Sequence, residues 1–244
     1  MQESRHYSRA PITEAIIDLK TTFPDEISLD TLKSIYEFIK DRFPSQELIR
    51  TGEIVLQPGT TDLVNASEHV TGFLYRSEDK SRAFQATLNG FTFNRLPPYT
   101  SWEEFSSEAK FLWEIYTKVC KPKAVIRAAI RFVNRLELPR PNLSLKEYLR
   151  IAPEIGSGLP QVQLSNFFMQ LQIPQEDCML VINEATVPST NPEVISIILD
   201  FDLFREHTWQ SDDEEIWKLL EKLRTLKNVA FETSITDATR RLID

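Results

Sequence analysis

The fold is decided by the stretch AVIRAAIRFVNRLEL, residues 124–138, in which arginines recur between apolar side chains. A period of two is typical of a β-strand with one buried face. Arg127, Arg131 and Arg135 share one face of this predicted strand, and the opposite face is apolar. The segment PITEAIIDLK, residues 11–20, alternates in the same way. The side chains predicted to be buried in the two strands are Ala15, Ile17, Leu19, Ala128, Ile130 and Phe132.

Each of these strands begins a similar succession of predicted elements. A helix preceded by Ser28 or Ser144 comes next, then three or four strands, and then a helix opened by a capping box at Ser101 or Ser211. The offsets between the two halves are 113 residues for the strands, 116 for the first caps and 110 for the capping boxes. This agreement indicates an internal duplication. The later strands are predicted at residues 47–57, 69–76, 82–96, 161–173, 178–187 and 194–204, and a final short helix after Thr236.

The expected fold class is α+β. Strands joined by short connections form an antiparallel sheet, and helices with one apolar stripe cover one face of it. We expect two repeats, residues 1–120 and 121–244, to pack as one globular domain with a curved antiparallel sheet backed by helices. This order of elements is similar to that of TATA-binding-protein-like and helix-grip folds, a similarity that implies no function.

Composition and charge are typical of a cytoplasmic protein. The 244 residues are 41% hydrophobic and 26% charged, and no apolar run reaches the roughly 18 residues of a membrane helix. Residues 1–10 lack the apolar core of a secretory signal, and two cysteines suit a reducing compartment. Residues 121–150 hold 8 basic and 2 acidic residues, but residues 151–244 hold 7 basic and 16 acidic ones. With a net charge of −8, the chain is a poor candidate for a nucleic-acid partner.

Signatures of known catalytic sites are missing from the sequence. The six glycines form no phosphate-binding loop, no Gly-x-Ser-x-Gly is present, and no His or Cys pair has metal-ligand spacing. We therefore expect no catalytic residue and no cofactor.

Asp200 and Asp202 lie on one face of a predicted strand, in the sequence Leu-Asp-Phe-Asp-Leu. Paired carboxylates can bind a divalent metal or share a proton, which would fit a metal-dependent enzyme. A solvated face or a cross-strand ion pair explains them as well, and we favour that interpretation because no third acid stands at a defined spacing.

The basic row of Arg127, Arg131 and Arg135 spans eight residues, about 26 Å on a strand. It would suit a small anionic ligand or a nucleotide. Alternatively, Glu14 and Asp18 of the equivalent first strand neutralise it, if the two strands lie side by side. We favour ion pairing, with anion binding as the second hypothesis.

Four motifs carry a resemblance to a known family. They are residues 7–15 (YSRAPITEA), 131–136 (RFVNRL), 199–202 (LDFD) and 231–237 (FETSITD). Their order over nearly the whole chain resembles a sporadically distributed family of uncharacterised prokaryotic proteins of about this length. The family contributes no catalytic residues. Its patchy distribution is similar to that of toxin–antitoxin and phage-defence genes.

These observations favour a non-enzymatic cytoplasmic binding protein. We expect it to act through a protein partner, encoded by a neighbouring gene, as an antitoxin, immunity or phage-defence component. The alternatives are a sensor of an anionic ligand through Arg127 and Arg131, and a metal-dependent enzyme around Asp200 and Asp202. No membrane association is expected.

Overall fold

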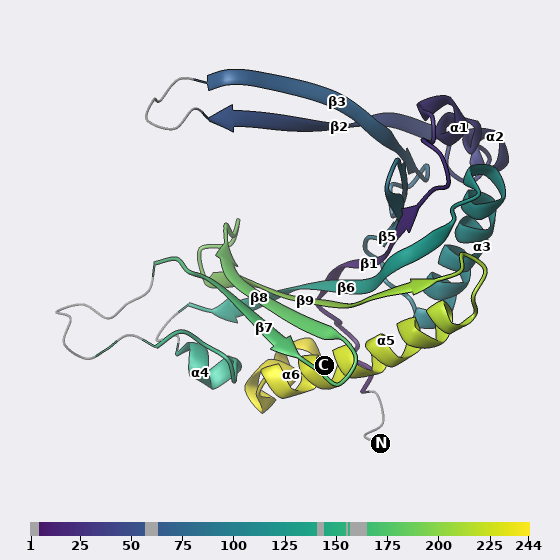
Figure 1. Ribbon diagram of the computed structural model, residues 1–244. Helices are drawn as coiled ribbons and strands as arrows, with labels where there is room; N and C mark the ends of the chain where they lie inside the picture. Colours follow the sequence, from purple (N-terminus) through teal and green to yellow (C-terminus); the bar gives the residue numbers. More distant parts are fainter. Residues whose placement is uncertain (1–4, 57–62, 141–143, 155, 157–164) are drawn as a thin grey trace. The chain divides into compact units, whose positions relative to one another are not determined.

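The computed structural model describes residues 5–56, 63–140, 144–154, 156 and 165–244. These residues form an α+β structure in which strands dominate (Figure 1). The strands are β1 (Ile12–Thr22), β2 (Ser45–Leu56), β3 (Leu63–Arg76), β4 (Arg82–Thr87), β5 (Gly90–Arg95), β6 (Ala124–Pro139), β7 (Phe168–Pro174), β8 (Met179–Val187) and β9 (Val194–Trp209). The helices are α1 (Leu29–Ser34), α2 (Tyr36–Ile39), α3 (Trp102–Cys120), α4 (Leu145–Tyr148), α5 (Glu215–Ser234) and α6 (Asp237–Ile243).

The strands form one open sheet with the order β2-β3-β4-β5-β1-β6-β9-β8-β7. The hairpin pairs β2–β3, β3–β4, β4–β5, β7–β8 and β8–β9 are all antiparallel. The amide of Arg135 donates to the carbonyl of Pro11, and that of Lys123 donates to Thr22, so β1 and β6 are antiparallel as well. The predicted α+β class with a large antiparallel sheet is confirmed.

The chain divides into two compact units. Unit 1 comprises Met1–Ile16, Ala128–Glu206 and Glu214–Asp244. Unit 2 comprises Ile17–Arg127 and His207–Asp213. Both β1 and β6 contribute residues to each unit.

The core of unit 2 is aromatic and lies between α3 and strands β3 to β5. The ring of Phe91 makes edge contacts with Trp113 and Tyr116 of α3, at centroid distances of 5.5 and 5.9 Å. The buried Tyr75 of β3 donates a hydrogen bond to the carbonyl of Leu32 in α1, at 3.0 Å. Such contacts bury most of the aromatic surface that this half of the sequence carries.

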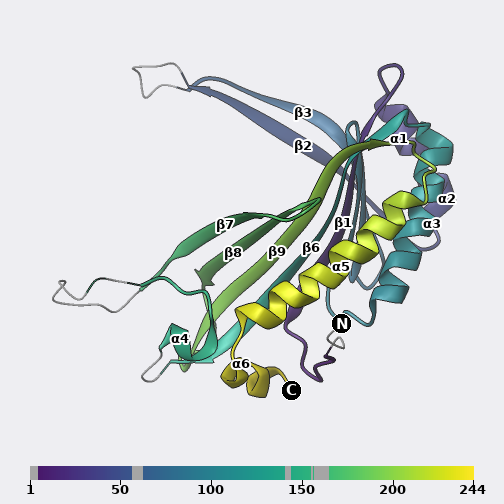
Figure 2. The same ribbon diagram turned by 60° about the horizontal axis from the view of Figure 1, so that its bottom comes forward.

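In unit 1, α5 runs along β6 and β9 and covers one face of these strands (Figure 2). Phe231 of α5 packs edge-on against Phe201 of β9, with ring centroids 6.2 Å apart. The amine of Lys227 lies 4.1 Å from the centroid of the Phe132 ring on β6. The residues of β6 and β9 that share a face with Phe132 and Phe201 therefore point toward α5.

Local sequence signals located most elements correctly. All six side chains predicted to be buried in the first strands are at most 1% exposed. Ser28, Ser101 and Thr236 each cap a helix by accepting a hydrogen bond from a backbone amide. Part of the strand predicted at 161–173 lies outside the described residues, because only its section from Phe168 is described as strand.

The capping box predicted at Ser211 is wrong. α5 begins at Glu215, and Glu214 precedes it in a helical conformation without a side-chain cap. Ser211 lies in a turn, and its carbonyl accepts a hydrogen bond from the indole of Trp113 at 3.0 Å. The helix thus begins beyond the reach of the Ser211 side chain, and the Ser211 backbone is bound by a residue far away in the sequence.

Candidate functional site

The first member of the basic row, Arg127, belongs to unit 2 and is ion-paired. Its guanidinium lies 3.1 Å from Oδ1 of Asp18 on β1. The other oxygen of Asp18 accepts a hydrogen bond from Thr92 at 2.8 Å and lies 3.3 Å from the amine of Lys20. The predicted pairing of Asp18 with this row is therefore present.

Arg131 pairs with an aspartate from a strand that the sequence did not place beside it. Its Nε and Nη2 donate to the two oxygens of Asp200 on β9, at 2.9 and 2.8 Å. Asp200 is only 2% exposed and also accepts a hydrogen bond from the Asn183 amide at 2.9 Å. The hydrogen bonds that Arg131 donates to Asp200 raise the pKa of Arg131, and the charges of Asp200, Asp202 and Glu14 add to this effect.

Arg135, the third member, contacts polar groups of its own unit. Its Nε donates to Glu137 at 2.7 Å, and its Nη2 donates to the hydroxyl of Ser196 at 2.9 Å and the carbonyl of Pro188 at 3.0 Å. Ser196 in turn donates to Glu137. Arg135 is thus held by a small closed network.

Each arginine of the row therefore has an acidic partner, which makes it a weaker attractor for an added anion. Asp200 is occupied by Arg131 and Asn183. No group of three His, Cys, Asp or Glu side chains in the described residues is arranged to hold a metal ion. Anion binding by Arg127, Arg131 and Arg135, and metal binding by Asp200 and Asp202, stay predictions.

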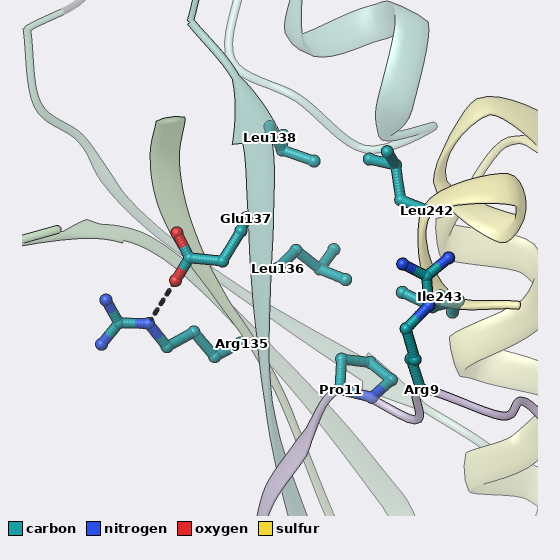
Figure 3. Close-up of a pocket in the computed structure, with 8 residues that line it drawn as sticks. All are labelled: Arg9, Pro11, Arg135, Leu136, Glu137, Leu138, Leu242 and Ile243. Atoms are coloured by element: carbon teal, nitrogen blue, oxygen red, sulfur yellow. Dashed lines mark hydrogen bonds and ion pairs between the residues drawn. The ribbon is translucent and has the colours of Figure 1, made fainter. Parts of the chain in front are cut away.

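A small pocket lies beside this region, at the end of β6 in unit 1 (Figure 3). Its volume is about 160 Å³. Leu136 and Leu138 point from β6 toward Leu242 and Ile243 of the C-terminal helix, whereas the Arg135–Glu137 pair lies on the other side of the strand (Figure 3). Arg9 is also part of the lining, and its guanidinium donates to the carbonyl of Asp244 at 2.9 Å. The lining of the pocket is thus mixed, and both of its arginines, Arg9 and Arg135, already have partners.

The edge strand β7 carries the most exposed apolar side chain of unit 1 in the described part of the chain. Phe168 is 70% exposed. Gln170 and Gln172 are exposed on the same face, and Gln170 donates to Asn183 at 2.8 Å. Because Asn183 donates to Asp200, a ladder of polar side chains runs from β7 to β6 on the face away from α5.

The opposite face of the same strands contains a buried acid. Glu184 of β8 lies between Leu199 of β9 and Met169 of β7 in the sheet register. It is 0% exposed, and neither carboxyl oxygen has a hydrogen-bond partner among the described residues. Burial raises the pKa of Glu184 to about 7. A carboxyl group in such a place is costly to ionise.

Sequence reasoning missed both β7 and Glu184 as functional candidates. A signal for β7 existed, since residues 168–173 (FMQLQI) contain no charge. Glu184 alternates with Leu180 and Ile182, so its predicted face was the apolar one. Its lack of a partner depends on the neighbouring strands and could not be read from the sequence.

Comparison with known proteins leaves the site to be interpreted from its own geometry. No known family matches the sequence, and no curated protein is significantly similar to it. Within the described residues, no helix is both long and apolar enough to cross a membrane.

Proposed function

We propose that this chain is a non-catalytic binding protein that holds an extended segment of a protein partner along the edge strand β7. The observation that carries the proposal is an uncharged strand at the end of the sheet, as far as the chain is described. An edge strand presents unpaired backbone amides and carbonyls, to which another chain can add as a further strand.

The two edges of the sheet differ in their protection. Natural edge strands are commonly protected by charges, which oppose pairing with other chains. β2 carries Glu47 and Arg50, both exposed. β7 has no charge, and its proline, Pro174, is its last residue, so the composition of residues 168–173 is that of a segment prone to strand pairing. An unprotected edge of this kind is a hazard unless a partner covers it.

Side chains of β7 offer a partner contacts on both faces. Phe168, Gln170 and Gln172 are exposed on one face. Met169, Leu171 and Ile173 are half-buried on the other. Aromatic and methionine side chains with few charges are typical of the centre of a protein interface.

The resemblance to a sporadically distributed prokaryotic family suggests the setting. We place the protein in the cytoplasm, as an antitoxin, immunity or phage-defence component whose partner is encoded nearby. Two free cysteines, Cys120 and Cys178, are compatible with a reducing compartment.

We also propose that the sheet arose by duplication, and that its order of elements is similar to that of TATA-binding-protein-like and helix-grip folds. The strand order supports this origin, because β5, β4 and β3 follow β1 outward just as β9, β8 and β7 follow β6. In this correspondence β2 is an addition to the first half, and β7 is the outermost described strand of the second half.

The test is co-purification of the tagged chain from its native host, compared between three versions. The double variant Gln170→Lys/Gln172→Lys places charge on the β7 edge at two exposed positions. The control variant Thr51→Lys places charge on an exposed position of β2. We expect a stoichiometric partner with the wild type and with Thr51→Lys, and its loss with the double variant.

Hydrogen exchange on the recovered complex then locates the contact. Protection of amides in 168–173 supports strand addition. Retention of the partner by the double variant, or protection confined to other strands, overturns it. Recovery of a second copy of the chain as the sole species at this edge also overturns it, in favour of self-pairing.

A further inference from the structure

We infer that Glu184 receives a basic side chain, lysine or arginine, that the protein partner extends across Met169. This inference rests on the proposed function, because it names the chemistry of the segment that adds to β7. It concerns the buried face of β7 and β8, whereas the partner's main-chain contacts involve the outer edge of β7.

The carboxyl group of Glu184 is buried and has no hydrogen-bond donor among the described residues. It is fully buried, and neither of its oxygens has a hydrogen-bond partner in the part of the chain that is described. Along β8 it follows the buried Ile182, and across the sheet it faces Leu199. The buried amide of Asn134 on β6 donates to the carbonyl of Leu199 at 3.0 Å.

The free-energy cost of burying such a carboxyl group can be reduced in two ways. It can keep its proton at neutral pH, or it can be paired with a cation that enters the site. Buried polar groups are nearly always satisfied in native proteins, and each exception calls for a cause. A donor that the partner supplies would be such a cause, and without the partner the buried acid is costly to ionise.

One adaptable side chain lies between Glu184 and the outer edge of β7. Met169 lies directly opposite Glu184 on β7 and is half-buried. Methionine has three rotatable bonds and moves aside readily. A strand added to β7 would place one residue opposite Met169, two strand spacings or about 9.6 Å from Glu184. Lysine and arginine are the longest charged side chains, and their length together with that of the Glu184 side chain covers that span.

The surroundings define the rest of the recognised segment. Leu171 and Ile173 continue the half-buried face beyond Met169. Partner residues two and four positions from the basic one would contact them, so these residues should be apolar. Residues 151–244 hold 16 acidic and 7 basic residues, and this excess favours the approach of a basic segment.

A substitution within the chain can imitate the partner's cation. Met169→Lys places an amine opposite Glu184, and Leu171→Lys places the same amine opposite Ile182 as a matched control. Thermal unfolding at pH 8 is compared in the wild-type and Glu184→Gln backgrounds. We expect Met169→Lys to melt about 2–4 °C higher than Leu171→Lys when Glu184 is present, and no higher in the Glu184→Gln background.

A soluble probe tests the site in the unaltered chain. n-Butylammonium chloride should raise the melting temperature of the wild type at pH 8, relative to sodium chloride and n-butanol at equal concentrations. The Glu184→Gln variant should not respond. Equal responses of the two proteins, or no response of either, overturn the inference, as does a Met169→Lys variant that melts no higher than Leu171→Lys.

These outcomes are separable from those of the proposed function. Loss of the partner with Gln170→Lys/Gln172→Lys, together with no effect of butylammonium, leaves strand addition standing and removes the cation site. A butylammonium effect, together with a partner whose binding does not depend on the β7 edge, supports the cation site and removes strand addition.

Discussion

Arg131 and Asp200 form a two-bond ion pair between β6 and β9, with N–O distances of 2.9 and 2.8 Å. The pair is uneven, because the Arg131 side chain is 48% exposed and that of Asp200 only 3%. Its stabilising role lies mainly in keeping a buried carboxylate paired, since leaving such a group alone is expensive.

We predict that Arg131→Ala lowers the free energy of unfolding by about 2–3 kcal/mol. The substitution leaves Asp200 buried with the Asn183 amide as its remaining side-chain donor. Urea unfolding monitored by circular dichroism measures the loss. Arg135→Ala is the control, because its ion pair with Glu137 is more exposed and should contribute at most about 1 kcal/mol. Equal costs for the two variants would contradict the assignment.

Glu184 should make the protein less stable as the pH rises from about 4.5 to 7. Its pKa is raised from 4.5 to about 7 in the folded chain, so the unfolded chain loses the proton first. The stabilising contribution of the protonated acid is complete below pH 4.5 and is lost as the pH passes through 7. Glu184→Gln should match the wild type at pH 4 and exceed it at pH 8 by on the order of 3 kcal/mol. If the free energy of unfolding changed with pH in the same way for the wild type and Glu184→Gln, the result would contradict a buried acid that has no partner among the described residues.

Lys227 should produce the opposite pH dependence. Burial, with a smaller effect of Arg224, lowers the pKa of its amine from 10.5 to about 7. The contribution of the neutral amine is complete above pH 10.5 and is lost as the pH falls through 7. Lys227→Met should therefore be more stable than the wild type at pH 6 and similar to it near pH 10.5. Lys222→Met, at an exposed position of the same helix, is the control and should show no such difference.

The uncharged edge of β7 should limit the solubility of the isolated protein. Gln170→Lys places a charge on the exposed face of β7 and should slow the growth of light scattering in concentrated samples. Thr51→Lys on β2 adds the same charge at the other edge and should have little effect. If both variants slow aggregation equally, net charge rather than edge pairing is the cause.

Much of the fold could be predicted from the sequence, because the signals are local. Alternation in 124–138 assigned Phe132 to a buried face, and it is 1% exposed. Capping by Ser101 depends on an amide three residues away, and that hydrogen bond is present at 3.2 Å. The failure at Ser211 shows the limit, since its carbonyl is bound by Trp113, 98 residues distant in the chain.

The candidate site depended on information that local patterns do not contain. The sequence identified both Arg131 and Asp200, but it offered Glu14 and Asp18 as the acids opposite the basic row, and of the row's arginines Asp18 pairs with Arg127. The two-bond partner of Arg131 is Asp200, because the sheet places β9 beside β6. Strand order results from pairing between segments far apart in the chain. The alternation of apolar and polar residues within one strand does not indicate which strand lies beside it.

The sequence by itself determined which residues are strands and which of their faces are buried, because periodicity and hydrophobicity act within a few residues. It also determined that Glu184 would share a face with Leu180 and Ile182. Only the tertiary structure decided that β7 would be left at an edge and that Glu184 would lie beside Met169 with no donor among the described residues. The physical reason is that the cost of a buried charge, and the exposure of an edge, depend on which distant strands are adjacent.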